Sequence, residues 1–137
     1  MGIRTEIAWC DSSVNPVVGC DGCELSGGHC YAEALVSRFA GKPGWPAAFD
    51  SPRVFMDRVP RAAKWADLRG TKRPDKPWLD GYRRLIFLCD LADPFSPSVS
   101  THWLWEAMNY IECSPHVWIL LTKRPHGFRE FAEAYIR

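Results

Sequence analysis

Three cysteines close together in the sequence have the spacing of a metal site. Cys20 and Cys23 form a C-x-x-C pair, and Cys30 follows after six further residues. This spacing allows two thiolates to reach one metal ion, and the nearby glycines Gly22, Gly27 and Gly28 allow the loop to fold Cys30 back onto it. Three soft thiolate ligands in so short a segment suit zinc or an iron–sulfur cluster.

Whether a fourth protein ligand is present distinguishes a zinc site from an iron–sulfur cluster. A structural zinc site is closed by four protein ligands, and His29 is the nearest further candidate. His29 directly precedes Cys30, and neighbouring side chains seldom point at one metal. A cluster held by three thiolates leaves one iron open to a small molecule, so we favour an iron–sulfur cluster. Zinc, three unrelated cysteines and a thioredoxin-like redox pair are the alternatives, although the redox pair gives Cys30 no role.

Five further polar residues follow two apolar runs, 85–89 and 117–121, that we expect to be strands. They are Asp90, Asp93, Thr122, Lys123 and Arg124. In parallel α/β folds, ligand sites form at the carboxyl ends of strands. Because Cys20 follows a strand expected at 14–19, we predict that the five residues line a cofactor-binding site beside it. The alternative for any one of them is loop solvation or helix capping.

The order of apolar segments predicts an α/β fold with parallel strand–helix units. We expect strands at 14–19, 84–89 and 117–121, and helices at 31–40, 59–68, 101–111 and 128–136. Continuous apolar runs are typical of strands buried on both faces, and their alternation with helices is typical of a parallel sheet.

The number of strand–helix units is small for a barrel. An eight-stranded TIM-type barrel needs about 250 residues, whereas the chain has 137. We therefore expect residues 1–137 to form a single domain, the N-terminal half of an incomplete α/β barrel; a complete small α/β domain is the alternative. Half a barrel leaves an open strand edge, which favours self-association or pairing with a missing C-terminal half.

The composition is that of a soluble globular protein. Hydrophobic residues make up 47% of the chain, enough for a packed core. A net charge of +1 does not support a nucleic-acid partner, and we expect the basic stretch 69–76 to be a solvated loop. The sequence has no signal-peptide core and no apolar run of about 18 residues, so we expect no membrane partner and a cytoplasmic location. Cysteines in that compartment are reduced, which favours metal binding over disulfides.

Several short motifs resemble a phage-encoded family of unassigned function, the gp-thirty-seven/gp-sixty-eight type. The motifs are Ile7-Ala8-Trp9, Asn15-Pro16-Val17-Val18-Gly19-Cys20, Cys30-Tyr31-Ala32-Glu33, Asp93-Pro94-Phe95 and Leu121-Thr122-Lys123-Arg124-Pro125. They occur in the expected order and span nearly the whole chain. Members of that family are usually longer, which agrees with an incomplete barrel.

That family is similar to radical S-adenosylmethionine enzymes and to spore photoproduct lyase. In those enzymes, three cysteines after the first barrel strand hold a four-iron–four-sulfur cluster whose open iron binds S-adenosylmethionine. The resemblance implies this role for Cys20, Cys23 and Cys30, an unknown substrate and, for a phage protein, a location in the host cytoplasm. The alternative function is a non-catalytic phage or prophage interaction module with a structural zinc site.

Overall fold

The fold is that of a computed structural model, which describes residues 2–24 and 28–137. Its elements in chain order are β1 (Ser12–Val14), β2 (Val17–Val18), α1 (Tyr31–Phe39), β3 (Arg53–Val54), α2 (Arg58–Ala63), the short 3-10 helix η2 (Pro77–Leu79), β4 (Leu85–Leu88), α3 (His102–Cys113), β5 (Val117–Leu120) and α4 (Pro125–Ile136). Three strands form a parallel sheet in the order β1-β4-β5, and β2 pairs with β3 in a separate antiparallel sheet.

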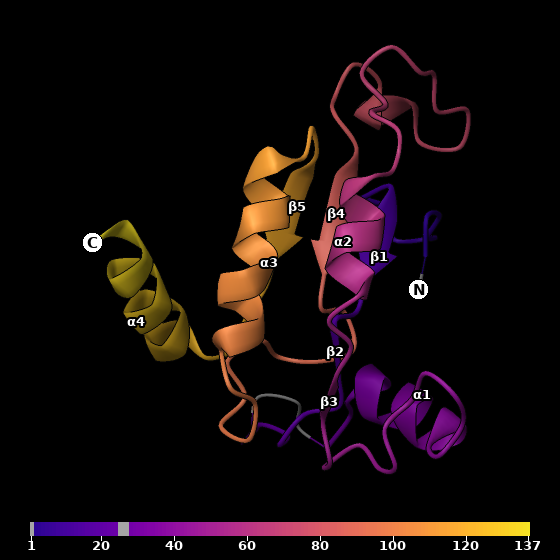
Figure 1. The fold of residues 1–137 in the computed structure, drawn as a ribbon. Coiled ribbons are helices and arrows are strands. Elements are labelled where there is room, and N and C mark those ends of the chain that lie inside the picture. Colours follow the sequence, from indigo (N-terminus) through magenta and orange to yellow (C-terminus); the bar gives the residue numbers. More distant parts are fainter. Residues whose placement is uncertain (1, 25–27) are drawn as a thin grey trace.

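The parallel sheet confirms the predicted α/β class. Ser12 lies beside Ile86 in the pairing of β1 with β4, and Leu85 lies beside Val117 in the pairing of β4 with β5. Helices α2 and α3 lie against one face of the sheet, and the carboxyl ends of the strands point toward α1, β2 and β3 (Figure 1). Residues 2–24 and 28–137 form an open sheet and no closed barrel.

The boundaries predicted for the first strand are wrong. The range 14–19 contains the end of β1, a break at Asn15 and Pro16, and then β2, which belongs to the other sheet. Pro16 has no N–H to donate to a sheet. The side-chain oxygen of Asn15 accepts a hydrogen bond from the backbone N–H of Leu91 at 3.0 Å. The chain therefore leaves the parallel sheet at Asn15, and Cys20 follows β2.

Strand β5 is less buried than its apolar sequence predicts. Val117 at its start is 42% exposed, and the other three residues of the strand are only partly buried. The strand pairs with β4 on one side, and no other strand of the described residues pairs with its outer edge. The prediction that 117–121 is buried on both faces is therefore wrong for this structure.

The main core lies between β4 and the two helices that cover it. Helix α3 buries Trp103, Leu104 and Ala107, a spacing that places them on one helical face. Leu88 packs in the same cluster, and Ile86 packs against α2. Burial of such side chains contributes about 1.5–3 kcal/mol each, so this layer holds β4 in the centre of the sheet.

Helices α2 and α4 differ most from their predicted boundaries, for local reasons. Helix α2 is shorter than the predicted range 59–68, because the N–H groups of Lys64 and Trp65 bond to carbonyls three residues back, at 3.2 and 3.0 Å. Such bonds tighten and end a helix. Helix α4 begins earlier than the predicted range 128–136. Its first residue is Pro125, whose ring suits the first helical position.

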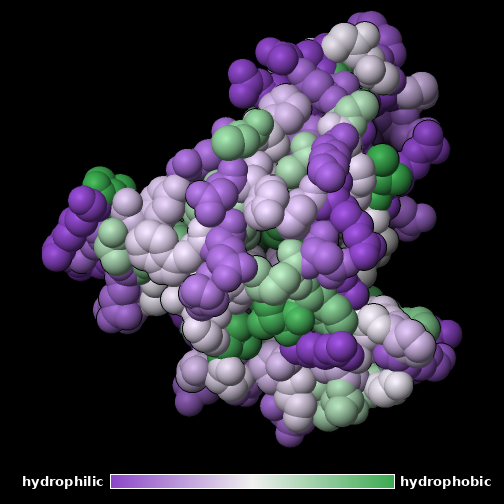
Figure 2. Space-filling view, viewed as in Figure 1, coloured by the Kyte–Doolittle hydropathy of each residue, from purple (hydrophilic) through white to green (hydrophobic). Residues whose placement is uncertain are grey.

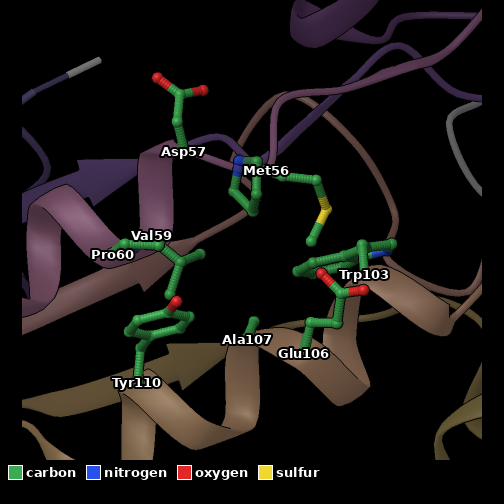
Figure 3. Close-up of a pocket in the computed structure, with 9 residues that line it drawn as sticks. Met56, Asp57, Val59, Pro60, Trp103, Glu106, Ala107 and Tyr110 are labelled. Carbon is green, nitrogen blue, oxygen red and sulfur yellow. The ribbon is translucent and has the colours of Figure 1, made fainter.

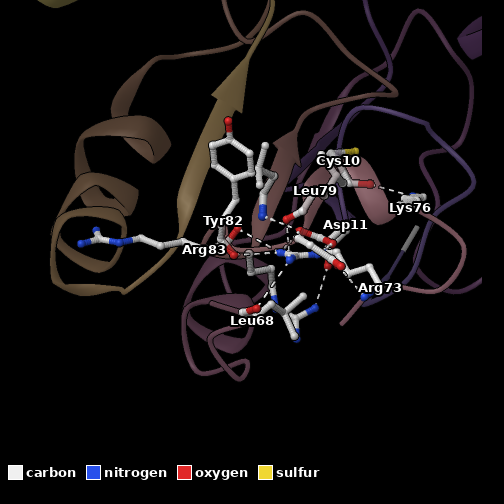
Figure 4. Close-up of polar contacts among 12 residues, drawn as sticks. Cys10, Asp11, Leu68, Arg73, Lys76, Leu79, Tyr82 and Arg83 are labelled. Atoms are coloured by element: carbon white, nitrogen blue, oxygen red, sulfur yellow. Dashed lines mark hydrogen bonds and ion pairs between the residues drawn. The ribbon is translucent and has the colours of Figure 1, made fainter. Parts of the chain in front are cut away.

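Two cations, Arg73 and Lys76, tie the N-terminal segment to the connector before β4. Arg73 forms an ion pair with Asp11, with Nε 2.5 Å from Oδ1, and donates to the carbonyls of Leu79 and Tyr82 (Figure 4). Lys76 donates to three backbone carbonyls of residues 5–10. The prediction of a solvated loop is therefore wrong for Arg73, which is buried. These contacts hold the connector before β4 against the segment that leads into β1.

The visible surface is mostly polar. No helix within residues 2–24 and 28–137 is long and apolar enough to cross a membrane. In the space-filling view, apolar side chains gather between the lower ends of α2 and α3, next to β2 and β3 (Figure 2).

Candidate functional site

The structure brings the loops after β2, β4 and β5 together at Cys20. This residue is only 8% exposed. Its Sγ lies 3.5 Å from the hydroxyl of Ser96, in the loop after β4, and 3.7 Å from Nη1 of Arg124, after β5. The other terminal nitrogen of Arg124 donates a hydrogen bond to the carbonyl of Gly22. A thiol, a hydroxyl and a guanidinium from three loops therefore meet at one point.

Asp93 fixes the loop after β5 to the loop after β4. Its carboxylate accepts hydrogen bonds from the Thr122 hydroxyl at 2.7 Å, from the Lys123 N–H at 2.9 Å and from the Phe95 N–H at 3.0 Å. It also pairs with Nη1 of Arg124 at 3.2 Å. A buried carboxylate is stable only with partners of this kind, so Asp93 and the loop after β5 hold each other in place.

The charges of this site stabilise one another. Partial burial opposes the charge of Arg124, but its hydrogen bond to Cys20 and the negative charges of Cys20 and Asp93 outweigh burial and raise the pKa of Arg124. Hydrogen bonds from the Ser96 hydroxyl, then from the N–H and hydroxyl of Ser98, lower the pKa of Asp21. The short segment after β2 is therefore held through Asp21 by the two serines and through Cys20 by the Arg124 cation.

Asp90, the fifth predicted cofactor residue, belongs to a different cluster. Asn15 donates an amide hydrogen bond to the Asp90 carboxylate, and the Tyr31 hydroxyl donates to the Asp90 carbonyl. Burial raises the pKa of Asp90. Burial and the Asp90 charge together raise the pKa of Tyr31 to about 12. Because Tyr31 is the first residue of α1, this cluster positions the start of the helix that directly follows Cys30.

The other two predicted ligands are less buried than Cys20. Cys23 and Cys30 are partly exposed, and Cys30 packs at the edge of the apolar cluster beneath α1. Within the described residues, no three His, Cys, Asp or Glu side chains form a group that could hold a metal ion. Gly27, one of the glycines expected to fold this loop, lies outside the described residues. The meeting of the three thiolates stays a prediction.

The chemistry of the donor set nevertheless suits a thiophilic metal. Cys20, Cys23 and Cys30 carry thiols rather than disulfides, as thiolate ligation of a metal requires, and the Arg124 guanidinium lies beside the Cys20 sulfur. By contrast, burial raises the pKa of the Cys10 and Cys89 thiols. Those two cysteines are therefore poor ligands, whereas the predicted three could hold zinc or an iron–sulfur cluster.

Sequence reasoning missed the polar residues that support Cys20. Asp21 lies inside the C-x-x-C motif, and Ser96 and Ser98 lie in the Pro-containing loop after β4. The available signal was the two serines on either side of Pro97, since hydroxyls in a loop at a strand end commonly bond to nearby carboxylates or backbone groups.

A cavity of about 290 Å³ lies elsewhere, between α2 and α3 (Figure 3). Met56, Val59 and Trp103 give it apolar walls, and the carboxylates of Asp57 and Glu106 lie at its rim. None of the predicted site residues lines this cavity. It belongs to the outer, helix-covered side of the sheet, whereas the cysteine site lies at the strand ends.

The fold and the site define an α/β protein with a polar cluster at the carboxyl ends of a parallel sheet. The chain belongs to the DUF5131 family, described as proteins of unknown function, whose family model matches residues 4–137. A search of curated proteins and a search of solved structures gave no match. The family match includes the three cysteines and both strand-end loops, and it assigns no activity to them.

Proposed function

We propose that the chain is an iron–sulfur protein in which Cys20, Cys23 and Cys30 hold a four-iron–four-sulfur cluster. In this proposal the open iron takes S-adenosylmethionine, and the bound cofactor supplies a carbon radical that acts on an unknown substrate. The observation that carries the proposal is the Cys20 thiol, buried at the strand ends and facing the Arg124 guanidinium, at the start of a segment with two more thiols.

Two features of this chain support a thiolate metal centre at this place. A cation and a hydroxyl lie beside the Cys20 sulfur, where both can bond to the sulfur when it ligates a metal. The site also lies at the carboxyl ends of parallel strands, where α/β proteins usually bind their ligands. Metal binding would hold Cys23 and Cys30 on the same centre as Cys20 and so couple the metal to the folding of this segment.

The five strand-end residues divide into three roles in this proposal. Asp93, Thr122 and Arg124 bond to one another, so they hold the loops around the cofactor rather than reaching far into the site. Lys123 is exposed at the same strand end, where its ammonium can meet the cofactor carboxylate. Asp90 contributes through the cluster that positions α1.

We also propose that this sheet is the first part of a TIM-type barrel. The strand order β1-β4-β5 follows the chain order of the parallel strands, and α2 and α3 cover the same face (Figure 1). Both are properties of consecutive βα units in a barrel. A C-terminal half or a second copy would supply the remaining strands.

Anaerobic purification followed by iron, sulfide and zinc analysis tests the proposal. We expect the wild-type chain to contain iron and sulfide in similar amounts and to absorb in the visible blue. Replacement of any one of Cys20, Cys23 and Cys30 by Ser should remove most of both. The matched control is Cys113→Ser, an exposed thiol at the end of α3, which should leave the iron content unchanged.

Two results would contradict the iron–sulfur centre. A wild-type chain without iron after anaerobic purification and reconstitution would do so directly. Stoichiometric zinc that depends on the same three cysteines would instead support the alternative, an interaction module with a structural zinc site.

A further inference from the structure

We propose that Arg124 is a positioning residue for residues 20–23, which it fixes against the carboxyl end of β5 so that Cys20 faces the metal site. The inference rests on the proposed metal centre and adds to it an outer partner that the cysteine motif does not contain. The site would bind a metal through thiolates, and Arg124 would affect that metal only through its contact with Cys20.

Arg124 contacts the turn after β2 at two points. Its Nη1 lies 3.7 Å from the Sγ of Cys20, and its Nη2 donates a hydrogen bond to the carbonyl of Gly22. One planar guanidinium therefore spans the first cysteine and the turn that leads to the second. An ammonium group could not reach both acceptors with the same fixed geometry.

The orientation of Arg124 is itself fixed from the other side. Asp93 pairs with Nη1 at 3.2 Å, and the backbone N–H of Arg124 donates to the Thr122 hydroxyl at 2.9 Å. That hydroxyl donates in turn to Asp93. Since the Arg124 side chain is 21% exposed and the Asp93 side chain 10%, the pair is largely shielded from water. The cation is thus held in place before any metal binds.

The sulfur of Cys20 has a second fixed neighbour. The Ser96 hydroxyl lies 3.5 Å from it, and Ser96 donates a hydrogen bond to Asp21. The backbone N–H of Asp21 donates to the Ser96 oxygen at 3.0 Å. Cys20 therefore lies between two partners contributed by the loops after β4 and β5. Groups that orient a metal ligand in this way typically change metal affinity by about 10- to 100-fold when removed.

Hydrogen exchange of the metal-free chain tests the positioning role without any cofactor. We expect Arg124→Gln to raise the exchange of the amides of residues 21–23 by about tenfold or more, because the loop loses its attachment to β5. Arg124→Lys should give a smaller increase. Amides of β4 serve as the internal reference for intact folding, and Arg129→Gln, an exposed arginine paired with Glu133 on α4, is the matched control. Unchanged exchange in both Arg124 variants would overturn the proposal.

Cobalt binding then tests the effect on the metal site. In the wild-type chain we expect a thiolate-to-cobalt absorption band, and in Arg124→Gln an affinity about 10- to 100-fold weaker with a shifted band. Arg124→Lys should restore part of the affinity. An unchanged affinity and spectrum in Arg124→Gln would overturn the role of Arg124 at the metal. A wild-type chain that binds no cobalt and takes up no iron on anaerobic reconstitution would overturn the proposed metal centre instead, and the exchange result would still decide whether Arg124 positions residues 20–23.

Discussion

Asp93 is a buried carboxylate shared by the loop after its own strand and the loop after β5. It accepts bonds from Thr122, Lys123 and Phe95 and pairs with Arg124. Removal of such a carboxylate leaves several donors without an acceptor, and one of them carries a charge. The side chain therefore contributes to stability as well as to the geometry around Cys20.

We expect Asp93→Ala to lower the free energy of unfolding by about 3 kcal/mol, since it leaves a charge without its partner. Asp93→Asn keeps one acceptor oxygen and should lower it by about 1–2 kcal/mol. Urea denaturation followed by circular dichroism measures both changes. The exposed Asp75 offers a matched control, since Asp75→Ala should stay within about 0.5 kcal/mol of wild type. An Asp93→Ala variant as stable as that control would refute the role given to the carboxylate.

The sequence predicts the location of the candidate site better than its contacts. Because parallel strands end at the same edge of the sheet, residues that follow different strands, such as Asp93 and Arg124, were expected near Cys20, and the structure places them there. The direction of each side chain depends on loop conformation, which no local pattern encodes. This is why Asp90 turned out to lie with Asn15 and not with Arg124.

Strand β4 and strand β5 lie within their predicted ranges because each is a continuous apolar run. The first predicted strand failed because its apolar run crosses Asn15 and Pro16. Which sheet the residues after this break join depends on long-range contacts, such as the hydrogen bond from the Leu91 N–H to the Asn15 side chain. β2 follows this break, and its sheet with β3 places Cys20 at the site.

Gly19 joins β2 to Cys20 in a conformation that favours glycine. Its φ angle is +99°, and a Cβ atom there would lie 2.7 Å from the carbonyl oxygen of Phe49 and 2.9 Å from Cα of Pro52. The same Phe49 carbonyl accepts a hydrogen bond from the N–H of Cys20 at 2.8 Å. A side chain at position 19 would therefore strain the backbone and displace the carbonyl that holds Cys20.

We expect Gly19→Ala to lower the free energy of unfolding by about 1–3 kcal/mol, the usual range for a strained backbone position. It should also raise hydrogen exchange at Cys20. Thermal or urea unfolding measures the first effect and mass spectrometry the second. In the control Gly70→Ala, the added methyl group meets open space, so stability should change by less than about 0.5 kcal/mol. Equal stability of the two variants would show that the turn tolerates a side chain.

At the scale of the whole molecule, β5 is an edge strand of the parallel sheet. Within the described residues β5 pairs only with β4, so its outer backbone groups face away from the sheet. Val117 is 42% exposed and Leu121, just after the strand, is 56% exposed. Unpaired strand edges with apolar side chains readily pair with other chains. The proposed barrel would cover this edge, since a closed barrel has no free strand edge.

We therefore expect the isolated chain to self-associate through β5. Light scattering over a series of concentrations should give a mean mass that rises above the 15.6 kDa of one chain. Val117→Lys places a charge on the strand edge and should keep the mass close to that value, because a charge on an edge strand opposes pairing. Val54→Lys makes the same change at an exposed valine on β3, away from this edge, and should leave association intact. A wild-type chain that stays at the mass of one chain throughout would refute pairing through β5. If both variants lose association equally, the cause is the added surface charge and not the β5 edge. An interface at β5 predicts that only the lysine at position 117 prevents association.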